Sequence, residues 1–174
     1  MKEEKLWNSN YIKVWLANFM IFFSFMLVTP LLPIYLSETF AADKHVIGVV
    51  LSGYTLTALL VRPFSGFIVD SYPRKQVLLI CFFLMFIFFA GYLVAGSLLL
   101  FAIVRTLHGA PFGATTVANS TVAIDVLHPS RRAEGIGYYG LSNNIATAIS
   151  PSVAIYLYQL THNFDLIFAI SMAV

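Results

Sequence analysis

The sequence predicts an all-α integral membrane protein, and two observations carry this prediction. Of its 174 residues, 59% are hydrophobic and 10% are charged, and the mean hydropathy is +0.83. This composition leaves too little polar surface to cover a soluble globule of this size. The apolar residues also gather in long runs, and five of these runs can cross a hydrocarbon core about 30 Å thick.

We expect membrane-spanning helices over 12–36, 46–69, 76–96, 98–127 and 135–159, with an incomplete sixth over 166–174. The first run is far longer than the apolar core of a signal peptide, so it is expected to remain in the protein. The last run is too short to cross a bilayer. The sequence therefore predicts one bundle over residues 1–174 that is a fragment of a longer membrane protein.

The basic residues predict the orientation of the bundle. Apart from Lys44 and two arginines inside the runs, Arg62 and Arg105, they lie at or before the start of the first run or in the loops after the second and fourth runs, at Lys2, Lys5, Lys13, Arg74, Lys75, Arg131 and Arg132. Such loops face the cytoplasm in multi-pass membrane proteins. We therefore expect a protein of the cell (inner) membrane, in contact with the lipid bilayer, whose N-terminus is cytoplasmic.

Composition and spacing exclude several other classes of function. The basic residues are scattered singly or in pairs, which argues against nucleic acid as a partner. Cys81 is the only cysteine, so neither a disulfide framework nor a metal-ligand spacing is present. The sequence also lacks a His/Asp/Glu ligand cluster and a Ser/His/Asp set, so we predict neither an enzyme nor a metal site.

Small residues recur at helical spacing in the fourth and fifth runs. Gly109 and Gly113 lie one turn apart, and Ser150 follows Ala146 at the same spacing. Such rows let helix backbones approach closely in membranes, and packing alone accounts for them. Pro151 removes a helix hydrogen bond beside Ser150, which predicts a buried bend.

Polar side chains inside the fourth run form a stripe that lipid would disfavour. Arg105 lies about 12 Å into this run, and His108, Thr115 and Asn119 fall on the same helix face. We interpret the stripe as a wall of a water-filled cavity with Arg105 as its cation. A structural arginine bonded to neighbouring carbonyls is the alternative, and His108 is either a proton carrier or a hydrogen-bonded core imidazole.

A second polar face is predicted on the fifth run, where Asn143 and Thr147 are one turn apart and could line the same cavity. Arg62 in the second run is near enough to the cytoplasmic side to extend toward it, so we expect a structural role there. Asp125 lies about 200° from Arg105 around its helix, at the cytoplasmic end. It is expected either to pair with a neighbouring helix end or a basic loop residue (Arg74, Arg131 or Arg132), or to remain solvated.

The loop after the second run contains Gly66, Asp70, Arg74 and Lys75 at a spacing that resembles the signature of the major facilitator superfamily. The resemblance implies the N-terminal six-helix half of a twelve-helix transporter, with the missing C-terminal half as its partner. It also implies a cytoplasmic gate. In this gate Gly66 permits close helix packing, Asp70 caps a helix of the other half, and Arg74 pairs with an acid such as Asp125.

Two further segments resemble motifs of this family. Arg105, His108 and Gly109 are similar to an Arg-x-x-Gln-Gly motif associated with proton coupling, and the segment with Ser150 and Pro151 is similar to a motif of exporters. The resemblance implies proton-coupled efflux of a small-molecule substrate, with the proton gradient as energy source and without a cofactor. An uptake permease of the same family, a membrane-embedded enzyme and a small membrane assembly protein are the alternatives.

Overall fold

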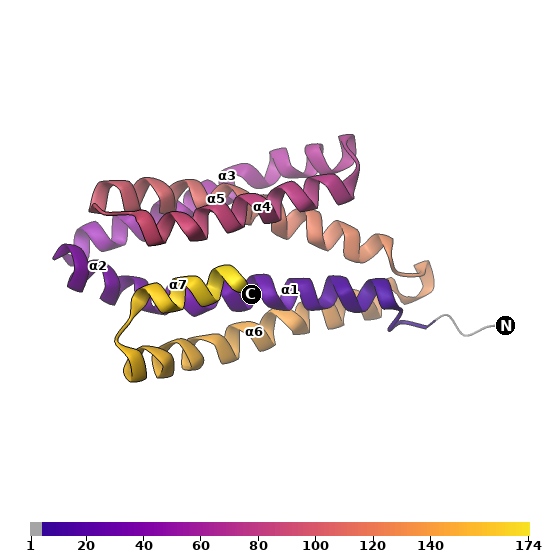
Figure 1. Cartoon of the computed structure of the whole chain (residues 1–174). Coiled ribbons are helices and arrows are strands. Elements are labelled where there is room, and N and C mark those ends of the chain that lie inside the picture. The colour runs from indigo at the N-terminus through magenta and orange to yellow at the C-terminus, as the bar shows by residue number, and fades with distance from the viewer. Residues whose placement is uncertain (1–4) are drawn as a thin grey trace.

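A computed structural model describes residues 5–174, and every regular element in that range is helical. The order along the chain is α1 (Ser9–Val28), the 3-10 turn η1 (Thr29–Leu31), α2 (Leu32–Phe40), α3 (Lys44–Ser71), α4 (Arg74–Val94), α5 (Leu98–Asp125), the 3-10 turn η2 (Pro129–Arg131), α6 (Arg132–Thr161) and α7 (Phe164–Ala173). The long helices run side by side along one axis (Figure 1). The predicted all-helical fold class is confirmed.

The first membrane segment differs most from its predicted bounds. It extends over Ser9–Phe40 and is interrupted by η1. Pro30 and Pro33 lie in the first turns of η1 and α2, where a missing backbone N–H removes no helix hydrogen bond. The two prolines therefore divide one long segment without ending it.

Capping residues fix the ends of several helices. The side chains of Asn8, Asp43, Ser97 and Asn163 each accept a hydrogen bond from a backbone N–H in the first turn that follows. At the C-terminal ends of α2 and α6, Ala41 and His162 adopt the left-handed conformation, with φ of 50° and 48°. The helix bounds therefore follow these capping residues rather than the limits of the apolar runs.

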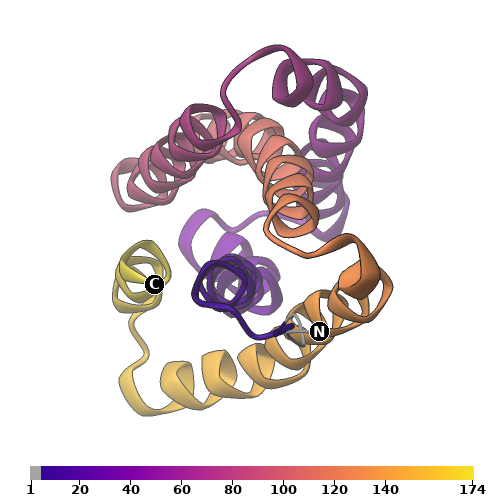
Figure 2. The ribbon, with the colours of Figure 1, turned by 90° about the vertical axis from the view of Figure 1, so that its right-hand side faces the viewer.

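Apart from the short α2, the α-helices of residues 5–174 form two groups of three. α3, α4 and α5 pack together, and so do α1, α6 and α7, with α1 near the centre when the bundle is seen end on (Figure 2). Contacts of α1 with α5 and of α4 with α7 join the groups. Aromatic side chains fill much of the space between the two groups. For example, the ring centroids of Phe25 in α1 and Phe112 in α5 are 4.5 Å apart.

The small residues lie at the closest helix contacts. A Cβ atom added to Gly113 of α5 would lie 2.5 Å from the carbonyl oxygen of Ala58, and one added to Gly109 would collide with the carbonyl oxygen of Tyr54. Both contacts are with α3. On α6, the hydroxyl of Ser150 donates to the carbonyl of Ala146 (2.5 Å) and is fully buried, while Pro151 is half-buried.

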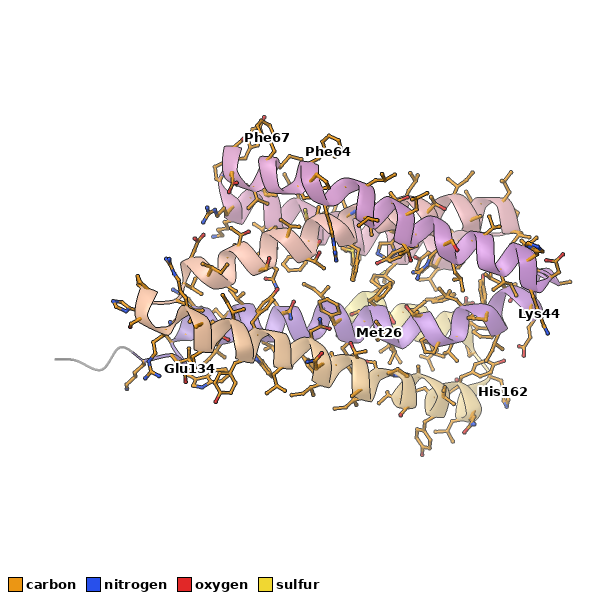
Figure 3. The ribbon with its side chains drawn as sticks, turned by 180° about the vertical axis from the view of Figure 1, so that it is seen from behind. Met26, Lys44, Phe64, Phe67, Glu134 and His162 are labelled. Atoms are coloured by element: carbon orange, nitrogen blue, oxygen red, sulfur yellow. The ribbon has the colours of Figure 1, made fainter. Side chains whose placement is uncertain are left out.

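Four segments in residues 5–174 are long and apolar enough to span a membrane: Ser9–Phe40, α3, α4 and α5. α6 has 30 residues and is long enough to cross, but its interior carries Asn143, Asn144 and Thr147, which lower its hydropathy. It runs alongside α1 at the edge of the bundle (Figure 3). α7 is a short apolar helix of 10 residues. Lys2, used above for orientation, lies outside the described residues.

Candidate functional site

Three helix ends meet at a charged cluster, which we call the loop-end cluster: Asp70, Arg74 and Asp125. Asp70 is in the last turn of α3, Arg74 begins α4, and Asp125 ends α5. Nη1 of Arg74 forms an ion pair with Oδ2 of Asp125, and Nη2 of Arg74 lies 3.7 Å from Oδ1 of Asp70. Among the partners predicted for Asp125, the structure selects Arg74. Arg131 instead pairs with Glu134, at 2.6 Å.

The loop-end cluster places charges where isolated helices disfavour them. A cation at a helix N-terminus and an anion at a C-terminus each oppose the helix dipole. Arg74 and Asp125 occupy such positions, so their pairing offsets two unfavourable interactions. Both side chains are about 40% exposed (38% and 41%), so water screens the pair and its contribution to stability is small.

Two other residues of the motif face outward. Lys75 is exposed and Gly66 lies on the open side of α3, where an added Cβ would meet no atom within 4 Å. Within residues 5–174, Gly66 therefore does not make the close helix contact that the resemblance implied for it. Asp70 is also exposed, with 75% of its side-chain surface accessible. These groups remain available to a partner on the open side of α3.

Arg105 lies inside the bundle, with 2% of its surface exposed. Its guanidinium carbon is 4.0 Å from the ring centroid of Tyr54 and 5.3 Å from that of Phe25, and Nη1 donates to the hydroxyl of Tyr92 at 3.0 Å. Nε has no hydrogen-bond partner among the described residues. Aromatic rings therefore stabilise this cation in place of a carboxylate or the carbonyls of a neighbouring helix.

His108 is fully buried beside Arg105 and shares its partner. Nδ1 lies 2.6 Å from the hydroxyl of Tyr92, and Nε2 lies 3.3 Å from the sulfur of Met85. The hydroxyl oxygen of Tyr92 accepts a hydrogen bond from Arg105, so the hydroxyl proton of Tyr92 is free to be donated to Nδ1 of His108. Nδ1 then carries no proton, and the imidazole proton lies on Nε2. The geometry matches the core-imidazole interpretation of His108.

The predicted cavity wall is not found among residues 5–174. Arg105, His108, Thr115 and Asn119 are all buried, and none of them lines the open cavities on α3, between α3 and α4 or beside α7. Thr115 donates to the carbonyl of Pro111 at 2.6 Å. The helical stripe is real, but neighbouring helices cover it. The expectation failed because the periodicity of one helix does not reveal what packs against it.

Asn119 belongs to a second buried site, at the junction of three helices. Its amide nitrogen donates to the hydroxyl of Tyr139 (3.1 Å) and to Oδ1 of Asn18 (3.4 Å), and Asn18 donates to the hydroxyl of Ser142 (2.8 Å). These hydrogen bonds join α1, α5 and α6. Buried amides without such partners would be costly, so the cluster fixes the relative position of these helices.

Asn143 and Thr147 remain on the accessible side of α6. Both are half-buried, and the hydroxyl of Thr147 donates to Oδ1 of Asn143 at 3.2 Å. They are separate from the Arg105 site.

Sequence reasoning missed Tyr54 and Tyr92, the residues that stabilise Arg105. The available signal was that each is the single tyrosine within its apolar run. A phenol hydroxyl in such a run favours a polar partner, and Tyr92 accepts from Arg105. Tyr54 contacts Arg105 through its ring, and its hydroxyl has no hydrogen-bond partner among the described residues.

Together, the fold and these sites define a multi-pass helical membrane protein, with polar groups buried between its helices and charges clustered at one end. The sequence model of the Major Facilitator Superfamily matches residues 14–174. The chain therefore belongs to the Major Facilitator Superfamily, whose members are transporters.

Two relatives illustrate the similarity. Quinolone resistance protein NorA of Staphylococcus aureus (strain MRSA252) is 21% identical over 162 residues, which cover 93% of this chain and 42% of the relative. The uncharacterized MFS-type transporter YqjV of Bacillus subtilis (strain 168) is 25% identical over 127 residues, which cover 73% of this chain and 31% of the relative. This chain thus spans less than half the length of either relative.

Proposed function

We propose that this chain is the N-terminal half of a secondary active transporter that exports a small molecule and uses the proton gradient. The observation that carries the proposal is the loop-end cluster of Asp70, Arg74 and Asp125, in which three helix ends meet at one end of the bundle. The name of the relative NorA, a quinolone resistance protein, supports export as the direction. In transporters of this architecture, the two halves rock about a site near the midplane.

In this proposal the loop-end cluster forms the N-terminal half of a cytoplasmic gate. Arg74 and Asp125 hold the ends of α4 and α5 together. The exposed carboxylate of Asp70 caps a helix N-terminus of the second half, where an anion is favoured. Gly66, which has open space around it, admits that helix closely. Lys75 lies at the membrane surface beside the gate, which faces the cytoplasm by the positive-inside bias.

The second half would supply the proton-binding carboxylate. Each Asp or Glu in residues 5–174 lies at a helix end or within the first or last turn of a helix. Arg105 and His108 would then act as positioning residues, because they hold α4 and α5 together around Tyr92. Asn143 and Thr147 would contact the substrate from the accessible side of α6.

The direct test is transport by the full-length protein in inverted membrane vesicles. We expect a fluorescent substrate to accumulate when a proton gradient is imposed and to leak out when an ionophore collapses that gradient. Vesicles with Asp70→Asn should accumulate less substrate, because the gate loses its capping charge. Accumulation that persists without a proton gradient would contradict proton coupling, and accumulation unchanged by Asp70→Asn would contradict the gate.

A further inference from the structure

Three side chains of α1 bind the backbone of α6 at the end of the bundle where both helices begin (Figure 1). Tyr11, Trp15 and Asn18 lie on successive turns of α1, and we call them the α1 ladder. Each donates a hydrogen bond to a backbone carbonyl of α6: Tyr11 to Gly135 at 2.5 Å, Trp15 to Tyr138 at 2.8 Å and Asn18 to Tyr139 at 3.4 Å. Because the acceptors are backbone groups, the α1 ladder constrains both the rotation of α6 about its axis and its position along α1.

The residues of α6 do not by themselves determine this rotation. Polar and apolar residues are less segregated around α6 than around the other long helices of residues 5–174. Its polar residues Ser142, Asn143 and Asn144 are consecutive, so their side chains point about 100° apart around the helix. Three of the first nine residues of α6 are glycines, which weaken the start of the helix.

The rest of the contact between α1 and α6 is formed by small residues. Ala146, Ser150 and Ala154 are fully buried, and the hydroxyl of Ser150 bonds within α6. Small residues let helices approach closely, but they offer no side-chain hydrogen bond that would fix a rotation. The next side-chain hydrogen bond from α6 to this segment lies at the opposite end of the bundle, from Tyr158 to Glu38 at 2.7 Å. The α1 ladder is therefore the polar contact that orients the first turns of α6.

The α1 ladder selects which polar residue of α6 faces α1. Asn18 also donates to the hydroxyl of Ser142 at 2.8 Å, and Ser142 is fully buried. Asn143 then points about 100° away from Ser142 and is half-buried. Thr147 donates to Oδ1 of Asn143, so these two side chains form one polar group. A rotation of α6 by one residue would bring Asn143 against Asn18 in place of Ser142.

We propose that the α1 ladder consists of positioning residues, which set the rotation of α6 and thereby present Asn143 and Thr147 to the transported molecule. The proposal rests on the proposed transport function, in which these two residues contact the substrate. It adds the residues that aim them. Every bond of the α1 ladder joins two helices of this chain, so the argument does not depend on what covers the outer surface of the bundle.

The first experiment measures the orientation of α6 in the full-length protein without a substrate. Ala146→Cys places a thiol on the buried face of α6, and Cys81, buried among α3, α4 and α5, reports general unfolding. N-ethylmaleimide labelling is then read for each cysteine by peptide mass spectrometry. Tyr11→Phe/Trp15→Phe removes two donors and keeps two aromatic rings, so labelling at position 146 should rise about 30-fold, about fivefold for each lost hydrogen bond. Labelling of Cys81 should not change.

Trp7→Phe is the matched control for the change at Trp15. Trp7 packs against Trp15 and Tyr138, with ring centroids 6.2 and 5.3 Å away, but it donates no hydrogen bond within residues 5–174. Labelling at position 146 should therefore stay at its original level in this variant. An equal rise in Trp7→Phe and Trp15→Phe would assign the effect to aromatic packing and overturn the proposal.

The second experiment measures ethidium uptake into inverted membrane vesicles under an imposed proton gradient. Tyr11→Phe/Trp15→Phe should raise KM about fivefold, as expected when the substrate loses one hydrogen bond, and leave the maximal rate per folded protein within about twofold. In a background of Asn143→Ala/Thr147→Ala the same change should raise KM no further, because the α1 ladder acts through those two residues.

The contrary results are distinct. Labelling at position 146 that stays low, or that rises together with labelling of Cys81, overturns the orienting role of the α1 ladder. A lower maximal rate with unchanged KM would make the α1 ladder purely structural, and a rise in KM that persists in the Asn143→Ala/Thr147→Ala background would mean that it acts elsewhere; either result overturns the proposal. If Tyr11→Phe/Trp15→Phe does not fold, Trp15→Phe alone decides, with about a fivefold rise in labelling expected. Wild type that transports neither ethidium nor a fluorescent carboxylate contradicts the proposed transport function, while the labelling result still tests the orientation of α6.

Discussion

Replacing Gly113 with alanine should force apart the two helices that approach each other most closely. The new Cβ would lie 2.5 Å from the carbonyl oxygen of Ala58, whereas an ordinary contact begins at 3.4 Å, so α3 and α5 must separate by about 0.9 Å. The obstacle is backbone and cannot rotate away. Overpacking of this kind costs about 1–3 kcal/mol.

Alanine also stabilises a helix by about 1 kcal/mol relative to glycine, and a matched variant removes this contribution from the comparison. Gly137 of α6 is such a control, because an added Cβ there meets no atom within 4 Å. Gly113→Ala should therefore be less stable than Gly137→Ala by about 2 kcal/mol, which corresponds to a melting temperature lower by roughly 5 °C.

The assay can use Cys81, the only cysteine of the chain, which is 6% exposed. A thiol-reactive dye labels this residue as the bundle unfolds on heating, and loss of helical circular dichroism provides an independent measure. If Gly113→Ala melts at or above the temperature of Gly137→Ala, the close contact between α3 and α5 is refuted.

Two further substitutions test the Arg105 site. Arg105→Lys should lower stability by about 1–2 kcal/mol in the same melting assay, because a lysine cannot both stack on Tyr54 and reach the hydroxyl of Tyr92; an unchanged melting temperature would contradict this role. His108→Gln should preserve proton-coupled transport, because a glutamine can accept from Tyr92 and direct its amide toward Met85. Loss of coupling with intact folding would instead make His108 a proton carrier.

The sequence predicts the helical membrane fold because this fold depends on local properties. Apolar runs of sufficient length, separated by polar turns, define membrane helices with little tertiary information. The loop between α3 and α4 consists of two residues, Tyr72 and Pro73. That short connection places Arg74 beside Asp70, a contact that the sequence analysis did not predict.

The interior of the bundle was less predictable, because it depends on which helices become neighbours. The stripe from Arg105 to Asn119 was correctly placed on one helix face, but the cover provided by Tyr54, Phe25 and Tyr92 comes from three other helices. Sequence reasoning likewise assigned Asn119 to the stripe, whereas it binds Asn18 across the bundle. The helix that supplies the partner of Arg105 or of Asn119 is determined only when all the side chains pack together.

The most direct test of the central claim is a charge exchange at the loop-end cluster, measured as proton-driven substrate efflux by the full-length protein. Arg74→Asp and Asp125→Arg should each reduce efflux, because each places two like charges in contact at adjoining helix ends. The double variant restores the attractive pair and aligns each charge with its helix dipole, but it also places a carboxylate at position 74, one turn from Asp70, so we expect it to recover part of the efflux. Efflux that is unaffected by both single variants would contradict a gate built on Arg74 and Asp125.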